Sequence, residues 1–119
     1  MNIKKVSEQT GVSADTIRYY ERIGLLPRVR RNKSGVRDFS EQDIAALEFI
    51  RCFRSASISV ESLIEYMSLV EEGEGTEKAR MKILEEQREK LISRIAELQA
   101  AKERLDYKIE NYKKLILKK

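Results

Sequence analysis

The residues 16–27, TIRYYERIGLLP, carry arginine and tyrosine side chains at helical spacing. Asp15, Arg18, Tyr19 and Arg22 follow the i, i+3, i+4, i+7 pattern and share one helix face. Guanidinium groups donate hydrogen bonds to base edges and phosphates, and tyrosine hydroxyls bind phosphate oxygens. The stretch therefore predicts a helix whose exposed face binds nucleic acid, against the alternative of a solvated face without a ligand.

A basic segment follows Pro27, the only proline of the chain. It reads RVRRNKSGVRDF, with turn-forming residues in its middle and Arg30, Arg31 and Lys33 around them. Valines and a phenylalanine flank the turn, so the pattern predicts a small β-hairpin. Such a wing beside a recognition helix adds phosphate or minor-groove contacts, whereas the alternative is a solubilising loop.

The elements that position these side chains are helices with clear start and stop signals. Residues 3–10 form a short helical pattern closed by Gly11, and Ser13 can cap a second helix from Ala14 to about Ile23. Two short helices joined by a glycine-containing turn are the outline of a helix-turn-helix.

Two further helices and one long helix are predicted downstream. Ser40 begins a capping box for a helix from Glu41 to about Ser55, and Ser59 can cap another to about Val70. The run EEGEGTE then breaks regularity, and Thr76 can cap a final helix. No proline or glycine occurs from Glu77 onward, which predicts that this final helix is uninterrupted.

The final helix carries a heptad repeat of apolar side chains, which predicts a coiled coil. A helix this long cannot bury its stripe in a small domain, so we expect a second chain to cover it; the alternative is a helix folded back on its own chain. Arg88 and Lys102 interrupt the stripe. The predicted dimerisation residues are Leu84, Leu91, Ile95, Leu98, Leu105, Ile109, Tyr112 and Ile116.

Composition narrows the classes of function. The net charge is +4, but residues 1–37 are strongly basic and residues 38–77 strongly acidic, which indicates segments with separate roles. Histidine is absent and cysteine occurs once, so an internal disulfide and a multi-cysteine metal site are excluded and most enzyme mechanisms are disfavoured. We expect no cofactor and no metal. No signal peptide or membrane span is visible, which predicts a cytoplasmic protein.

The run VSEQTGVSADTIRYYERIGLLP, followed by SGVRDFSEQDI, closely resembles the MerR family of bacterial transcription regulators over essentially the whole chain. The resemblance implies an all-α fold with a small β-hairpin wing. A winged helix-turn-helix head with a second helix pair would occupy residues 1–72. A linker at 73–76 would lead to an antiparallel coiled-coil dimerisation helix at 77–119. Family members bind double-stranded promoter DNA as homodimers and, on sensing a signal, distort it so that RNA polymerase can use it.

Site residues are implied by the same resemblance. Arg18 and Tyr19 would face DNA, Tyr20 would contact the backbone nearby, and Arg37 matches the arginine of the family's wing motif. Val36 departs from the aromatic residue of many members. The predicted DNA-binding set is Ser13, Thr16, Arg18, Tyr19, Tyr20, Arg22, Arg30, Arg31, Lys33 and Arg37.

The single cysteine carries two open interpretations. The segments IRCFRSA and LDYKIENYKK resemble the single-cysteine branch of the family that responds to reactive aldehydes and other small electrophiles, which makes Cys52 a signal sensor. Cys52 also shares a helix face with Ala45, Phe49 and Ala56, which favours burial as an inert core thiol.

The sequence thus favours an activating, stress-responsive transcription regulator of the MerR type. The alternative from another class is a coiled-coil protein-interaction module in which the acidic segment recruits a partner and the basic head gives no specific DNA binding.

Overall fold

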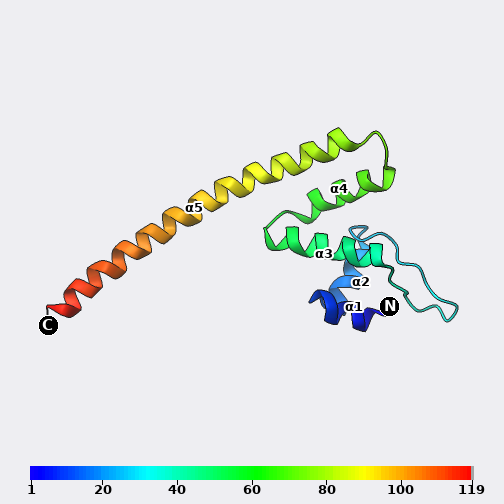
Figure 1. Cartoon of the computed structure of the whole chain (residues 1–119), viewed down its shortest axis with the longest axis horizontal. Helices are drawn as coiled ribbons and strands as arrows, with labels where there is room; N and C mark the ends of the chain where they lie inside the picture. The colour runs from blue at the N-terminus through cyan, green and yellow to red at the C-terminus, as the bar shows by residue number, and fades with distance from the viewer. Residues whose placement is uncertain (119) are drawn as a thin grey trace. The chain divides into compact units, whose positions relative to one another are not determined.

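The computed structural model describes residues 1–118 and is mostly helical (Figure 1). Its elements are α1 (Ile3–Thr10), α2 (Ala14–Arg22), α3 (Glu41–Ser55), α4 (Val60–Glu72) and α5 (Glu77–Leu117). The predicted helices are confirmed. No strand forms within residues 1–118, and the predicted hairpin is a loop with a single antiparallel bridge between Arg31 and Arg37.

The missing strand pairing has a local cause in the side chain of Asn32. Its Oδ1 accepts hydrogen bonds from the backbone N–H groups of Ser34 (2.9 Å) and Val36 (3.1 Å). The Val36 N–H therefore binds the Asn32 side chain instead of the Asn32 carbonyl, which would extend the ladder by one pair, and the Ser34 N–H is held at the tip of the turn. The backbone bonds from Asn32 N to Val36 O and from Asp38 N to Arg30 O, both 2.8 Å, still hold the two arms of the loop together.

Helix boundaries coincide with the predicted caps. Ser13, Ser40 and Ser59 each accept a hydrogen bond from the backbone N–H three residues on, and Ser40 with Asp43 completes a capping box. Gly11 ends α1 at φ 78°, in the left-handed region that favours glycine. These caps fix where the first two helices meet.

One apolar core joins α1, α2 and α3 with the loop after α2. Figure 1 shows α3 between the α1–α2 pair and α4. Val6, Ile17, Leu25, Leu47 and Ile50 are fully buried in this core. Each such side chain stabilises the fold by about 1.5–3 kcal/mol relative to exposure. The core therefore holds α2 by its Ile17 face and leaves the opposite face at the surface.

Aromatic rings connect α3 to α4. The Phe49 and Tyr66 rings stack with centroids 5.2 Å apart, and the Phe49 and Phe53 rings lie 4.5 Å apart. Leu63 and Met67 of α4 are buried in the same core cluster. The second helix pair is therefore packed onto the same core as the first.

The chain divides into two compact units, Met1–Ile83 and the segment from Leu84 onward. α5 contributes its first turns to the first unit and makes up the second. Thr76 stands before α5, but its hydroxyl donates to the carbonyls of Leu69 (3.0 Å) and Gly73 (2.6 Å) and thereby closes α4. At 1.5 Å per residue, the 41 residues of α5 extend about 60 Å.

No helix within residues 1–118 combines the length and the apolar character needed to cross a membrane.

Candidate nucleic-acid interface

The exposed face of α2 is made of the side chains that its spacing predicts. Arg18 and Tyr19 are exposed, and the Arg18 Nη1 atom lies 3.0 Å from Asp15 Oδ1. The Arg22 guanidinium lies over the Tyr19 ring, with 5.5 Å from its Cζ to the ring centroid. The face therefore presents guanidinium donors and a phenol hydroxyl on a helix whose other side is buried.

The first turn of α2 adds two hydroxyl groups to this face. Ser13 Oγ accepts from the Thr16 backbone N–H at 3.1 Å and donates to Thr16 Oγ1 at 2.7 Å. A helix N-terminus favours negative charge, because its backbone N–H groups and its dipole both point toward an anion. Ser13 is exposed and Thr16 half-buried, so this turn lies at the edge of the Arg18 face.

Tyr20 lies on a different side of α2 from its neighbour. It is half-buried and packs against the core residues, with its ring centroid 6.2 Å from that of Tyr19. The carbonyl of Tyr20 accepts the backbone N–H groups of Leu25 and Leu26. Tyr20 therefore fixes the end of α2 and the turn after it, in addition to any contact that its hydroxyl makes.

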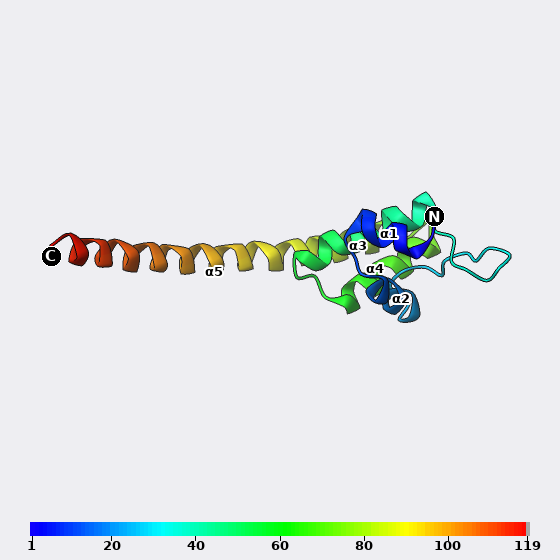
Figure 2. The ribbon, with the colours of Figure 1, turned by 90° about the horizontal axis from the view of Figure 1, so that it is seen from below.

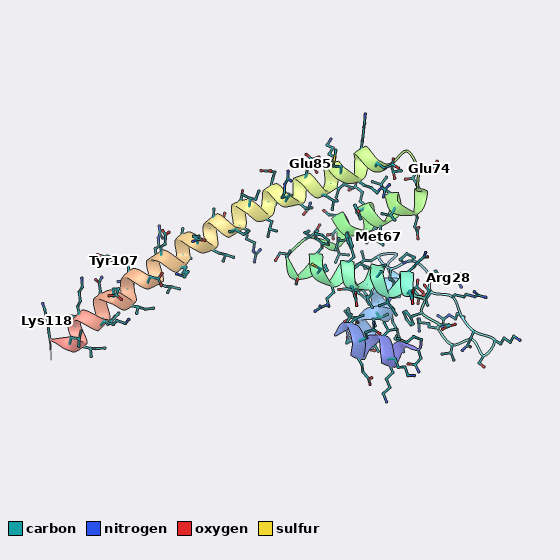
Figure 3. The ribbon with its side chains drawn as sticks, in the orientation of Figure 1. Arg28, Met67, Glu74, Glu85, Tyr107 and Lys118 are labelled. Carbon is teal, nitrogen blue, oxygen red and sulfur yellow. The ribbon has the colours of Figure 1, made fainter. Side chains whose placement is uncertain are left out.

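The loop at residues 28–38, called the basic loop, projects beyond the helices of the first unit (Figure 2). Arg28, labelled in Figure 3, stands at its start. Arg30, Arg31 and Lys33 are exposed, and Arg31 Nη1 donates to the carbonyl of Gly35 at 3.2 Å. Three cations on one short segment fit a role in neutralising phosphates.

Arg37 is bound within the fold. Its Nε donates to Glu21 Oε1 at 2.7 Å, and the exposed fractions of the Arg37 and Glu21 side chains are 21% and 10%. Glu21 Oε2 also accepts the backbone N–H of Val29 at 2.7 Å. Burial alone raises the pKa of Glu21, but the hydrogen bonds from Arg37 and Val29 and the charges of Arg37 and Arg31 lower it below its ordinary value.

Glu21 is a site residue that the sequence analysis missed. It stands within RYYER as an acidic residue among basic ones, and only this charge contrast signals it in the sequence. Its partners lie 8 and 16 residues away, a separation that helical periodicity does not address.

Cys52 is exposed, so of the two open interpretations the inert buried thiol is wrong in the described chain. The reason is geometric. α3 buries Leu47 and Ile50 and packs the rings of Phe49 and Phe53 against the core, whereas Ala45 and Cys52 lie on the solvent side. Cys52 is on a different helix from the Arg18 face and makes no part of that surface.

The apolar heptad positions of α5 are not covered within the described chain. Ile95 is 53% exposed and Leu98 is 60% exposed, and no side chain of Glu77–Leu117 is buried. Figure 3 shows side chains radiating from α5 around Tyr107. The seam thus lies open along the second unit at Leu84, Ile95, Leu98, Leu105, Ile109, Tyr112 and Ile116, and Leu91 is half-buried.

Two models of known protein families match the chain. The family described as "MerR HTH family regulatory protein" matches residues 1–69, and that described as "MerR, DNA binding" matches residues 44–107. The HTH-type transcriptional regulator AdhR of Bacillus subtilis is 52% identical over 92 residues, which cover 77% of this chain and 66% of AdhR. Some other curated relatives are matched over about half of their length.

Solved structures of MerR family regulators are similar to this chain over most of its length. A putative MerR family transcriptional regulator from Listeria monocytogenes has a TM-score of 0.91 and 54% identity, over 94% of this chain and 85% of that one. HiNmlR, a regulator lacking the sensor domain and bound to promoter DNA, has a TM-score of 0.86 and 31% identity, over 95% and 90% of the two chains.

Proposed function

Because the chain belongs to the MerR family of regulatory proteins, we propose that it is a sequence-specific DNA-binding regulator of transcription and not an enzyme. The observation that carries this proposal is the exposed face of α2. Arg18, Tyr19 and Arg22 stand on a helix whose opposite side is held by the core at Ile17. The similarity to a regulator bound to promoter DNA supports it.

In this proposal α2 enters the major groove as a recognition helix. Arg18 binds a base edge or a phosphate, Tyr19 donates to a phosphate oxygen, and Arg22 adds a further cation. Ser13 and Thr16 bind the backbone at the first turn of the helix, and Tyr20 supports it from the side. The basic loop acts as the wing, with Arg30, Arg31 and Lys33 neutralising phosphates beside the groove.

A homodimer is the second part of the proposal. The open seam of α5 is apolar at most a and d positions, so a second copy of the chain covers it as an antiparallel coiled coil. Two heads then read a palindromic site. The head with its second helix pair at 1–72, the linker at 73–76 and the coiled coil at 77–119 are the corresponding domains. We expect the dimer to act in the cytoplasm.

The signal-dependent step is the third part. The dimer distorts promoter DNA so that RNA polymerase reads two promoter elements in register, which makes polymerase an indirect partner. We propose that a reactive aldehyde or another small electrophile triggers this change through Cys52. The exposure of the thiol in the described chain supports access of a small molecule to it.

Binding to labelled DNA from upstream of the protein's own gene, at two salt concentrations, tests the regulator proposal. We expect tight binding to one palindrome and an affinity that falls steeply with salt. Equal, shallow binding to all fragments would favour a protein-interaction module instead.

A further inference from the structure

Glu21 uses both oxygens of its carboxylate to hold the basic loop. Oε2 accepts from the backbone N–H of Val29, where the loop begins, and Oε1 accepts from Arg37 Nε, where it ends; both distances are 2.7 Å. Glu21 itself belongs to α2, the proposed recognition helix. One side chain of this helix therefore ties both ends of the loop.

The segment between the two tied ends is fixed internally. Backbone hydrogen bonds join Arg30 to Asp38 and Asn32 to Val36, and the Arg31 guanidinium closes onto Gly35. The loop consequently keeps its own form, and its placement depends on what holds its two ends: Glu21 joins both ends to α2, and the Met1 amino group lies 2.8 Å from Asp38 Oδ1 at the second end. Val29 is buried, Arg37 is half-buried and the Glu21 side chain is only 10% exposed, so this attachment is largely shielded from solvent.

The chemistry of this attachment is stronger than that of a surface contact. Carboxylates accept shorter and stronger hydrogen bonds than neutral groups, and an ion pair of low exposure is little screened by salt. A carboxylate also carries an electrostatic cost beside a phosphate backbone. That cost is reduced here because Glu21 is turned into the fold and paired with Arg37, while Arg18, Tyr19 and Arg22 occupy the outer face of the helix.

We propose that Glu21 is the positioning residue that sets the basic loop against the recognition helix, so that both engage one DNA site together. Glu21 acts through the loop and touches no DNA. Arg37, in turn, serves mainly as the second half of this attachment. The inference rests on the proposed DNA binding, which it deepens by naming how the two binding elements are held in register.

A positioning role differs from a purely stabilising one in how mutations combine. If Glu21 places the loop, then loop cations contribute to binding only while Glu21 is present. If Glu21 only stabilises the fold, the losses of DNA-binding free energy caused by Glu21→Gln and by the loop substitutions are additive in the folded protein. The coupling free energy between Glu21 and the loop cations, which is the departure of the combined variant from additivity, therefore distinguishes the two roles.

The experiment measures operator affinity and its salt dependence for four chains: the parent, Glu21→Gln, a loop variant with Arg30, Arg31 and Lys33 changed to Ala, and the combination. Glutamine offers one acceptor oxygen and turns an amide toward the other donor. In the parent background we expect the loop variant to bind at least tenfold more weakly. The slope of the logarithm of its binding constant against the logarithm of salt concentration should be smaller in magnitude by about 2–3. In the Glu21→Gln background we expect the same loop changes to alter affinity less than about twofold.

Two further variants control the interpretation. Glu8→Gln makes the same acid-to-amide change at an exposed position of α1, and we expect it to leave the loop effect at its parental size. Arg37→Gln removes the other half of the ion pair and should also diminish the loop effect, which keeps the test decisive if Glu21→Gln folds poorly. Losses of operator-binding free energy that are fully additive in both the Glu21→Gln and the Arg37→Gln background would overturn the positioning role.

Hydrogen exchange of the free protein gives a readout that needs no DNA. We expect the Val29 amide to exchange at least tenfold faster in Glu21→Gln than in the parent, and to be accelerated more than core amides such as that of Leu47, whose exchange reports the global free energy of unfolding. An unchanged Val29 rate would show that Glu21 does not hold the loop. If the parent binds no operator while Val29 responds as expected, the proposed function fails although the attachment stands.

Discussion

Arg18 and Asp15 form an ion pair one turn apart on α2, with 3.0 Å between Arg18 Nη1 and Asp15 Oδ1. Asp15 is almost fully exposed, and an exposed i, i+3 pair contributes only about 0.2–1 kcal/mol. Breaking this ion pair therefore costs little free energy when the Arg18 guanidinium binds DNA instead of Asp15. Asp15 keeps the arginine near the helix surface without burying it.

Replacing Arg18 by Ala should weaken binding to the specific operator by about 1–3 kcal/mol if the guanidinium reads a base edge, and by less if it binds phosphate alone. The side chain is about half exposed, so the free energy of unfolding should stay within about 0.5 kcal/mol of the parent value. Titration of operator and scrambled fragments separates the two cases. Unchanged operator affinity in the folded variant would remove Arg18 from the interface.

The ion pair between Glu21 and Arg37 predicts a dependence of stability on pH. The pKa of Glu21 is lowered in the folded chain, so its contribution to stability is full above the unfolded value of about 4.3 and is lost as pH falls through the lower folded value. Glu21→Gln should lower the free energy of unfolding at pH 7 by about 1–3 kcal/mol.

The same variant should flatten the loss of stability between about pH 5 and pH 3. Urea unfolding of parent and variant across this range is the measurement. Parallel curves for the two proteins would mean that another carboxyl group, such as that of Asp38, dominates the acid response; the pKa of Asp38 is also lowered, by the hydrogen bond and charge of the Met1 amino group.

The open seam of α5 predicts a dimer at micromolar concentration. Leu98→Lys should convert it to monomers that bind their operator poorly, because a lysine at a d position has no apolar partner surface. Sedimentation of the two proteins is the measurement. Ala100→Lys, two residues away and off the seam, is the matched control and should remain dimeric. A stable monomer for the parent chain would contradict the coiled-coil proposal.

We expect substitution of Cys52 to abolish the response to the signal and to leave DNA binding unchanged. Cys52→Ser should bind operator DNA like the parent, because residue 52 lies outside the α2 face and the basic loop. The variant should, however, fail to activate transcription in vitro when an aldehyde is added. In the parent, mass spectrometry should find one adduct on the only cysteine. An aldehyde response of full size in the variant would assign the signal to another group.

Helices could be predicted from the sequence better than contacts between distant segments. Serine caps and glycine stops are local signals, so α1 and α3 have the bounds that Gly11 and Ser40 indicate. Extension of the pairing in the basic loop depended on whether the Val36 N–H binds the carbonyl or the side chain of Asn32, and it binds the side chain. Residue patterns alone do not decide that competition.

Burial and pairing across the chain were the weaker predictions. The spacing of Ala45, Phe49 and Ala56 placed Cys52 on an apolar face, yet the packing of α3 is decided by Leu47 and Ile50. The tie between Glu21 and Arg37 spans 16 residues and depends on the path of the loop. Such contacts arise from the tertiary fold, which local periodicity does not contain.

The hydrogen bonds to Asn32 Oδ1 also affect how the protein behaves at high concentration. A basic hairpin with regular strands would present a row of unpaired N–H and C=O groups, and such an edge can recruit strands from other molecules. In the basic loop, the hydrogen bond from Val36 to Asn32 Oδ1 stops the antiparallel pairing after one bridge, between Arg31 and Arg37, and both bridge residues are cationic; short and charged edges pair poorly with other strands. The segment is consequently a poor template for intermolecular β-pairing, so its polar surface stays available to a polyanion and resists self-association.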